Sequence, residues 1–327
     1  MNIPPDAFVR VPATDLQAFA GRLGQAAGLP RDQADLLADL LTANDLRGVF
    51  SHGTQQLATY VRLIRDGVLN GTATPAVVRE TPSSLLVDGD GGLGYFPAHV
   101  GTRRLIEKVA LTGIAVLVTR NHGHFGAAGL YTRMTLEHDL LCFVTSGHQL
   151  QLTAGDPVYA AAGGSPMSFS APTDREAPLV LDFGAMHDLY EDAPHRNQIA
   201  SLAPGIVHRA IGLGTVCQAW GGFLAGVPLE SGRADRRYLG ATQGSMVIAL
   251  KIDLFLPPEQ FKAEMDAYVR SVRALDAFSP GQHSYLPGGI EAARDQAFRA
   301  DGIPIGETHQ GLLQTVAAEF GVEVPWS

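Results

Sequence analysis

Ser51 and His52 are neighbours in a short segment, residues 45–53, that also carries Arg47. Small turn-forming residues are expected at a joint between two helices, so this composition is typical of a functional site. Imidazole titrates close to neutral pH, and a histidine beside a hydroxyl can therefore transfer a proton to or from a reacting atom. A second interpretation is that Ser51 caps the following helix and His52 only fills space. The local sequence leaves both interpretations open.

A second dense segment, Asn121–Gly129, places His122 and His124 among glycines and small residues after the most strongly apolar run, residues 113–118. Loops between a strand end and a helix commonly hold ligands, and free amides at a helix N-terminus favour a phosphate or a carboxylate. The two histidines have the spacing of metal ligands, but no acidic or cysteine partner is nearby in the sequence. We therefore expect anion or cofactor contact here and no metal.

Three later segments also combine small residues with single polar groups: 163–166, 182–184 and 207–213. Each alone is compatible with ordinary turn chemistry. Together with Asn121–Gly129 they predict a backbone-lined cleft for a large polar ligand.

The elements that must position these residues follow from apolar periodicity. Helices are expected over 14–27, with Thr14 as N-cap, and over 31–44, 55–65, 98–111, 127–137, 208–224, 258–275, 290–300 and 309–319. Strands are expected over 76–78, 84–87, 113–118, 140–145, 166–170, 179–181 and 244–250. The pattern is helical for the first seventy or so residues and mixed thereafter.

The run Gly89–Gly94 satisfies the glycine pattern of a dinucleotide-binding turn, lies after a strand and leads into a helix. A Rossmann unit should also place an acidic residue for the ribose at the end of the next strand, where this chain has Thr119, Arg120 and Asn121. Arg120 could accept a 2′-phosphate, but the chain lacks repeated strand–helix alternation. A structural tight turn is the favoured interpretation.

The composition restricts the class of protein. A chain of 327 residues, 46% of them hydrophobic, can bury a sizeable core and divides into two or three packed parts. The 24 basic and 33 acidic residues give a net charge of −9, which disfavours nucleic acid or an anionic membrane as partner. Cys142 and Cys217 form no metal or disulfide spacing, and neither a signal peptide nor a membrane span is apparent, so we expect a cytoplasmic protein.

The order and spacing of these motifs resemble the malate/L-lactate dehydrogenase family of the non-Rossmann type, which includes ureidoglycolate dehydrogenase, diketogulonate reductase and piperidine-2-carboxylate reductase. The resemblance covers nearly the whole chain. Its motifs are Arg47-Gly48 with Ser51-His52-Gly53, Tyr60 with Gly67, Asp88–Gly94, His124–Gly126 with Ala128, Gly129 and Tyr131, Gly163 and Pro166, Asp182, His208-Arg209 with Gly212-Leu213, Leu286–Gly288, and Gly302–Pro304.

The resemblance implies an α/β (α+β) fold in which helical terminal segments surround a central, largely antiparallel cofactor domain. We expect a helical segment over 1–75, the cofactor domain over 76–255 and a helical segment over 256–327 that packs on the first. It also implies a homodimer that acts on a small molecule.

The implied reaction is reversible hydride transfer between NADPH or NADH and a 2-oxo acid or the equivalent imine. His52 would be the proton donor or acceptor, supported by Ser51, and Asp192 would orient it. Arg47 would hold a substrate carboxylate, with Gln56 and His124 also at the substrate. The implied cofactor-binding residues are His124, Phe125, Gly126, Gly164, Ser165, Asp182, Gly184, His208, Arg209, Pro287 and Gly288.

The chain also departs from the family pattern. Gly164 and Ser165 stand where threonine and asparagine are usual, Gln56 replaces an arginine, and Arg209 replaces a lysine. The segment between Asp182 and His208 is shorter than is typical. The loss of charge near the substrate indicates one larger or less acidic than malate or lactate, such as a cyclic imine carboxylate.

An alternative function follows from Gly164 and from Met186, which also departs from the pattern. In this alternative the chain has lost hydride transfer, and the Ser51/His52 site catalyses cofactor-independent proton transfer, isomerisation or elimination.

Overall fold

The computed structural model describes residues 4–277 and 283–326. By their contacts they form two compact units: the first unit is Met1–Ala73 with Gly288–Ser327, and the second unit is Thr74–Pro287. The boundary expected at residue 256 differs from this division, because residues 256–287 group with the second unit.

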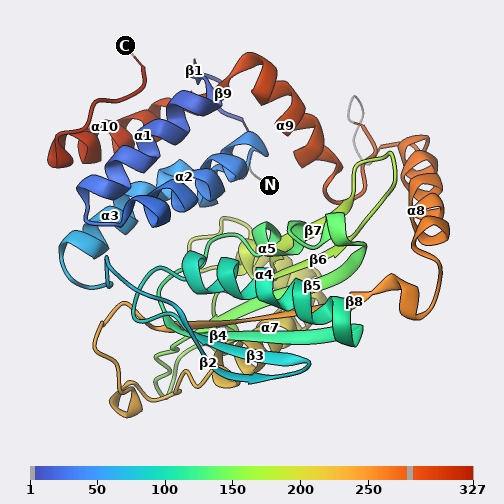
Figure 1. Ribbon diagram of the computed structural model, residues 1–327, viewed down its shortest axis with the longest axis horizontal. Coiled ribbons are helices and arrows are strands. Elements are labelled where there is room, and N and C mark those ends of the chain that lie inside the picture. Colours follow the sequence, from blue (N-terminus) through green and yellow to red (C-terminus); the bar gives the residue numbers. More distant parts are fainter. Residues whose placement is uncertain (1–3, 278–282, 327) are drawn as a thin grey trace. The chain divides into compact units, whose positions relative to one another are not determined.

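The first unit is mainly helical, with one short antiparallel strand pair (Figure 1). Its elements are β1 (Phe8–Val11), α1 (Ala13–Ala26), α2 (Arg31–Leu46), α3 (Leu57–Arg65), α9 (Gly289–Asp301), β9 (Ile303–Gly306) and α10 (Glu307–Phe320). The predicted helices are confirmed, whereas β1 and β9 were not predicted. Leucine, valine and phenylalanine side chains spaced along α1, α2, α3 and α10 form its buried core.

The start of α1 differs from the expectation. Pro12 holds the N-cap position, and its carbonyl accepts backbone hydrogen bonds from Asp15 and Leu16. Thr14 is the second helical residue, so its prediction as N-cap is wrong. A proline immediately before the first turn is well tolerated because no helical partner is lost there.

The second unit is built on a mixed sheet of seven strands within the described part of the chain, in the order β2-β3-β4-β8-β5-β6-β7. The strands are β2 (Ala76–Thr81), β3 (Ser84–Asp88), β4 (Ile114–His122), β5 (Leu140–His148), β6 (Pro166–Ala171), β7 (Leu179–Gly184) and β8 (Gln243–Lys251). Only the β3–β4 pairing is parallel among these, and α4 (Tyr95–Thr112) makes the crossover that it requires. The largely antiparallel, non-Rossmann fold is therefore confirmed.

Helices cover both faces of this sheet (Figure 1). On one face, α5 (Gly129–Arg133) packs against β6, where the Thr132 and Ser168 hydroxyls are 2.9 Å apart. On the other face, the Phe143 ring pairs with Phe169 and also meets Trp220 from the segment after α7 (Pro204–Cys217). Side chains alternate between the faces of a strand, which is why neighbouring residues of β6 serve different helices.

Two helix predictions in the second unit need correction, and one helix was missed. The helix expected over 127–137 is only α5, followed by a 3₁₀ turn at Leu136–His138 that ends with Asp139 in the left-handed region. The helix expected from residue 208 begins at Pro204, a favourable first position, and continues as a π-helical segment, Gln218–Phe223. A short helix, α6 (Arg196–Leu202), was not predicted, and α8 (Pro258–Arg273) agrees with expectation.

The glycine run Gly89–Gly94 is a structural turn. Gly89, Gly91 and Gly94 donate backbone hydrogen bonds to carbonyls in the segment 120–124. A Cβ on Gly94 would lie 2.7 Å from the Gly123 oxygen and 2.6 Å from the His122 ring. These glycines allow two loops of the protein to approach each other.

No single helix in the described ranges is long and apolar enough to cross a membrane, although the bent pair Arg196–Leu202 and Pro204–Phe223 passes that test of length and composition.

Candidate active site

The Ser51–His52 pair lies in a 3₁₀ turn, Phe50–His52, in the joint between α2 and α3. The Asn44 side-chain amide donates to the His52 carbonyl at 2.8 Å. The Gln56 side-chain amide donates to the Ser51 carbonyl at 2.7 Å. Side chains on both sides of the turn therefore hold its backbone. Gln56, which was expected at the substrate, supports the turn through its contact with the Ser51 carbonyl.

The Ser51 hydroxyl oxygen lies 2.9 Å from Nδ1 of His52. A hydrogen bond at one ring nitrogen sets the orientation and tautomer of a catalytic imidazole. The competing interpretation of Ser51 as a helix cap is wrong, since Gln56 is the N-cap of α3 and no described side chain caps that helix.

Arg47 ends α2 and is followed by Gly48 in the left-handed region, at φ 72°. Its Nε lies 4.0 Å from a carboxylate oxygen of Asp295 on α9. The Phe50 ring stacks on Phe298 of the same helix, with centroids 6.3 Å apart. Helix α9 therefore fixes this side of the joint, and a carboxylate bound by Arg47 would share the guanidinium with Asp295.

A buried polar group beneath the turn was not predicted. The Thr54 backbone amide and hydroxyl donate to Oδ2 of Asp45 at 2.9 and 2.6 Å, and the same hydroxyl lies 3.1 Å from Nε2 of His309. Burial raises the pKa of Asp45 to about 7 and lowers that of His309 to about 4. Asp45 is the first residue of the predicted segment and Thr54 directly follows it, whereas nothing in the sequence links His309 to it.

In the second unit, His122 is the last residue of β4 and lies in the protein interior. Its Nε2 is 2.7 Å from the Thr119 hydroxyl and its Nδ1 is 2.7 Å from the Gly123 carbonyl. Burial lowers its pKa to about 4. Protein atoms therefore contact both ring nitrogens, and its role is to join the strand end to the following loop.

Three of the residues expected to bind the cofactor, His124, Phe125 and Gly126, follow β4 and differ in exposure. Phe125 is buried, stacks on Tyr131 at 5.3 Å and accepts a hydrogen bond from the Tyr131 hydroxyl through its carbonyl. Gly126 adopts φ 82° beside the Tyr95 ring. His124 is partly exposed. Phe125 and Gly126 thus shape the loop that carries His124.

The segments 163–165 and 184–186 lie side by side where β6 begins and β7 ends, because Pro166 pairs with Gly184. The fully buried Ser165 adopts φ 47°, and its hydroxyl accepts a hydrogen bond from the Met186 amide at 3.0 Å. The Gly164 carbonyl accepts one from the Tyr190 hydroxyl at 3.0 Å. The Ser165 side chain is therefore engaged in joining the two segments.

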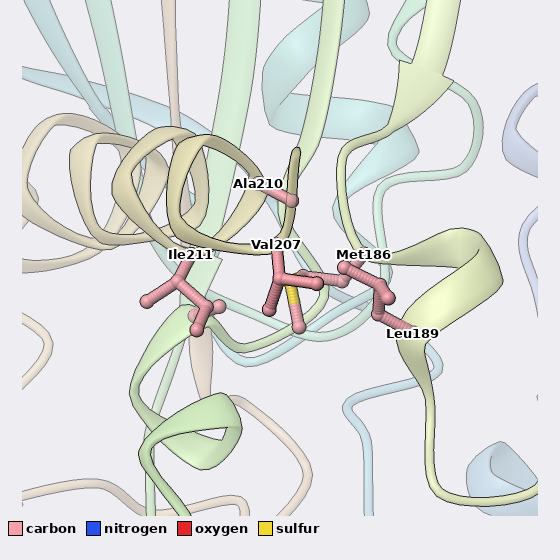
Figure 2. Close-up of a cluster of buried hydrophobic side chains, with 6 residues drawn as sticks. Met186, Leu189, Val207, Ala210 and Ile211 are labelled. Atoms are coloured by element: carbon pink, nitrogen blue, oxygen red, sulfur yellow. The ribbon is translucent and has the colours of Figure 1, made fainter. Parts of the chain in front are cut away.

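Helix α7 is attached to these segments through a buried apolar cluster (Figure 2). Val207, Ala210 and Ile211 pack with Met186 and Leu189 in this cluster. His208 and Arg209 are exposed and lie on the part of the helix turned away from it. Met186, which departs from the family pattern, is thus a core residue. The exposed side of α7 carries His208 and Arg209, the polar groups expected at a cofactor.

Two of the other expected cofactor residues, Asp182 and Pro287, anchor β7. Asp182 accepts a hydrogen bond from the Gly129 amide, at the start of α5, at 2.9 Å. The Pro287 carbonyl accepts one from Val180 at 2.9 Å, and Gly288 is the N-cap of α9. Asp192 lies in an exposed turn of the second unit. Its expected contact with His52 of the first unit stays a prediction.

The groups around residue 164 fit a large polar ligand. A Cβ on Gly164 would have, among the described residues, only Pro166 at 3.9 Å and His148 at 4.0 Å within reach, so space is open there. The nearby Gln218 side chain is buried, and its Nε2 has no hydrogen-bond partner in the part of the chain that the structure describes. Open space and an unpartnered buried amide donor in this region, together with the exposed cation of Arg209 on α7, suit a phosphate-bearing nucleotide.

Comparison with known proteins agrees with this fold. The family model described as malate/L-lactate dehydrogenase matches residues 11–186 and 190–313. The chain is 26% identical to a malate dehydrogenase of Pyrococcus horikoshii over 97% of each chain. It is 25% identical to a malate/(S)-sulfolactate dehydrogenase of Methanothermus fervidus, covering 92% of this chain and 95% of that protein.

The solved structure of the Pyrococcus horikoshii malate dehydrogenase has the same fold, with a TM-score of 0.85, 24% identity and 99% of each chain covered. Because the family model covers nearly the whole chain, this protein belongs to the malate/L-lactate dehydrogenase family and is an oxidoreductase, for which its dehydrogenase relatives imply a nicotinamide cofactor.

Proposed function

We propose that this enzyme transfers hydride reversibly between NADPH or NADH and a 2-oxo acid/2-hydroxy acid pair or a cyclic imine carboxylate, with His52 as general acid and base. The observation that carries the proposal is the 2.9 Å contact between the Ser51 hydroxyl and Nδ1 of His52. A catalytic imidazole needs a fixed orientation, and this contact together with the Asn44 and Gln56 hydrogen bonds supplies it.

The cofactor supplies or accepts the hydride when it is bound. The His52 imidazolium donates a proton to the substrate oxygen or nitrogen in the reductive direction, and the imidazole accepts it in the oxidative direction. Arg47 holds the substrate carboxylate through its guanidinium. His124 lines the substrate side.

Residues of the second unit hold the nucleotide. Gly164 and Gly184 line it with backbone, Asp182 and Pro287 fix the strand beside it, and Arg209 with His208 binds its phosphates. Arg120, a second candidate for a 2′-phosphate, is paired with Asp88 at 2.9 Å and lines a cavity of about 270 Å³ together with Arg233 and Arg236. This set of arginines suits either nucleotide.

The substrate is less acidic than malate. The Gln56 amide is engaged with the Ser51 carbonyl at 2.7 Å, where the family pattern has an arginine. A neutral amide used in this way gives no charge for a second carboxylate. This supports a monocarboxylate with a larger body, such as a cyclic imine carboxylate.

Titration of the purified protein with NADPH and NADH, followed by nicotinamide fluorescence, tests the cofactor. We expect saturable binding of at least one nucleotide at micromolar concentration. Binding of neither by the folded protein would overturn hydride transfer and favour cofactor-independent proton transfer at Ser51/His52.

His52→Ala tests the catalytic assignment. Turnover of the best 2-oxo acid or imine should fall by about 10²–10⁴-fold with little change in nucleotide affinity. His138→Ala is the matched control, because His138 is an exposed histidine of the second unit and should be neutral. Unchanged turnover in His52→Ala would remove His52 from the mechanism.

We also propose that the enzyme is a homodimer. Helix α7 is apolar on its buried side, yet Ile206, Leu213, Val216 and Trp220 on and after it are 41–52% exposed. Large apolar side chains that are exposed together on neighbouring turns are normally covered by another surface. Sedimentation velocity should give a dimer for the wild type and a monomer for Leu213→Glu, with Leu111→Glu on α4 as an exposed control. A monomeric wild type would contradict the proposal.

A further inference from the structure

The glycine that follows His52 is required by a neighbouring side chain. Gly53 has φ −92° and ψ −153°, a conformation open to other residues. A Cβ on Gly53 would nevertheless lie 1.8 Å from Oδ1 of Asp45 and 2.4 Å from its Cγ. The Asp45 carboxyl therefore occupies the place of the missing side chain, which explains why a glycine stands here.

The same carboxyl fixes the next residue. Its Oδ2 accepts hydrogen bonds from both the amide and the hydroxyl of Thr54, and Asp45 and Thr54 are each fully buried. Asn44, the residue before Asp45, donates to the His52 carbonyl. Two consecutive side chains at the end of α2 thus hold three consecutive residues of the joint, His52, Gly53 and Thr54.

Stability alone is a poor account of this arrangement. A fully buried carboxyl is costly, and Oδ1 of Asp45 has no hydrogen-bond partner among the residues that the structure describes. An apolar or small residue would avoid that cost but would leave Gly53 and Thr54 unrestrained. Geometric control of the joint is what the carboxyl supplies.

We infer that Asp45 is a positioning residue: its carboxyl restrains Gly53 and Thr54 and so sets the position of the His52 imidazole. The inference rests on the proposed role of His52 in catalysis. Asp45 itself does not touch the reacting atoms, and it acts through the backbone of the turn.

The first test measures thermal unfolding without substrate and does not depend on any activity. Gly53→Ala should lower Tm by about 3 to 10 °C, because the new methyl group overpacks against a buried carboxyl. In an Asp45→Ala background, Gly53→Ala should lower Tm much less, because the carboxyl with which the new methyl group clashes is gone. Gly311→Ala, at an α10 position with open space around its Cβ, is the control and should not lower Tm.

Additive Tm shifts in this cycle would overturn the inference, because they would show that Asp45 and Gly53 do not constrain each other. If Asp45→Ala fails to fold, Asp45→Ser replaces the carboxyl with a smaller hydroxyl and completes the cycle in its place.

The second test separates positioning from structure by steady-state kinetics. Asp45→Ala should lower kcat by about 10- to 100-fold through misplacement of His52, with KM and nucleotide affinity nearly unchanged. Asp45→Asn, which still presents an acceptor to Thr54, should recover most of kcat. Wild-type kcat in folded Asp45→Ala would overturn the inference. Unchanged turnover in His52→Ala would instead overturn the proposed function, while the Tm cycle would still decide whether Asp45 fixes the turn.

Discussion

The Thr54 hydroxyl lies 3.1 Å from Nε2 of His309, a residue 255 positions later in the chain. The same hydroxyl contacts Asp45 at 2.6 Å, so it joins an acidic and a basic group in the interior of the first unit. Burial shifts their pKa values in opposite directions, to about 7 for Asp45 and about 4 for His309. Both groups are therefore uncharged between these values, and their effects on folding oppose each other.

The direction in which each group changes the free energy of unfolding with pH follows from proton binding. Between pH 3.8 and about 7 the native state keeps the Asp45 proton that the unfolded chain releases, so this contribution to the free energy of unfolding is lost as pH rises. Between about pH 4 and pH 6.5 the unfolded chain binds a proton on His309 that the native state does not, so that contribution is lost as pH falls. The full contribution to the free energy of unfolding is about 4 kcal/mol for Asp45 and about 3 kcal/mol for His309.

Urea unfolding of Asp45→Asn and His309→Gln from pH 4.5 to 7 measures the two effects separately. Relative to the wild type, Asp45→Asn should gain stability as pH rises, and His309→Gln should lose stability as pH rises. Each comparison with the wild type cancels the contribution of His122, which is present in all three proteins. If the free energy of unfolding of a variant and that of the wild type change with pH in parallel, the pKa shift assigned to that residue is contradicted.

Ser51→Ala tests the hydroxyl at Nδ1 of His52. Removal of one hydrogen bond from an oriented imidazole should lower kcat by about 5- to 10-fold, less than the loss expected for His52→Ala. Nucleotide affinity should stay unchanged. Ser51→Thr keeps the hydroxyl and is the matched control. Equal kcat values for the alanine and threonine variants would show that the hydroxyl does not orient the ring.

Periodicity predicted most of the fold because the amphipathic signal is local. The spacing of leucines over 31–44 gave α2, and the apolar run at 113–118 gave β4. The pair β1–β9 was missed because each strand has only four residues and its partner lies almost a chain length away, with Val9 opposite Ile305. Short strands paired at such distance have no local pattern.

The candidate site shows the same limit. Ser51 and His52 could be predicted to interact because they are adjacent. Asp45 could not be singled out, since a polar residue near a helix end is ordinarily solvated, and only the fold shows that it is buried against Gly53. The resemblance to the family predicted Ser165 as a site residue. It could not predict that the Ser165 hydroxyl accepts a hydrogen bond from the Met186 amide.

Arg209→Ala tests the phosphate contact proposed for α7. Loss of a charge-assisted hydrogen bond should raise the Kd of NADPH or NADH by about 10- to 100-fold, with a smaller effect at high salt. Arg103→Ala, an exposed arginine on α4, is the control and should leave Kd unchanged. If the two variants bind equally well, Arg209 does not contact the nucleotide. Arg209→Lys should retain part of the affinity.

The neighbouring glycines at 163 and 164 give a matched pair of substitutions. Gly163 has φ 58°, and a Cβ there would lie 2.0 Å from the buried Gln218 amide, so Gly163→Ala should lower Tm by about 4 °C or more. Gly164 has open space, so Gly164→Ala should leave Tm unchanged or slightly raised.

Gly164→Thr then restores the hydroxyl that the family pattern has at this position. Because space is available, the protein should fold normally, and one additional hydrogen bond should lower the Kd of the bound nucleotide by about 3- to 10-fold. Fluorescence titration of the wild type, Gly164→Ala and Gly164→Thr measures this, with the valine variant as a control of equal shape without the hydroxyl. Tighter binding by threonine but not by valine would place a nucleotide acceptor beside residue 164, whereas equal affinities in all four proteins would remove this residue from the cofactor site.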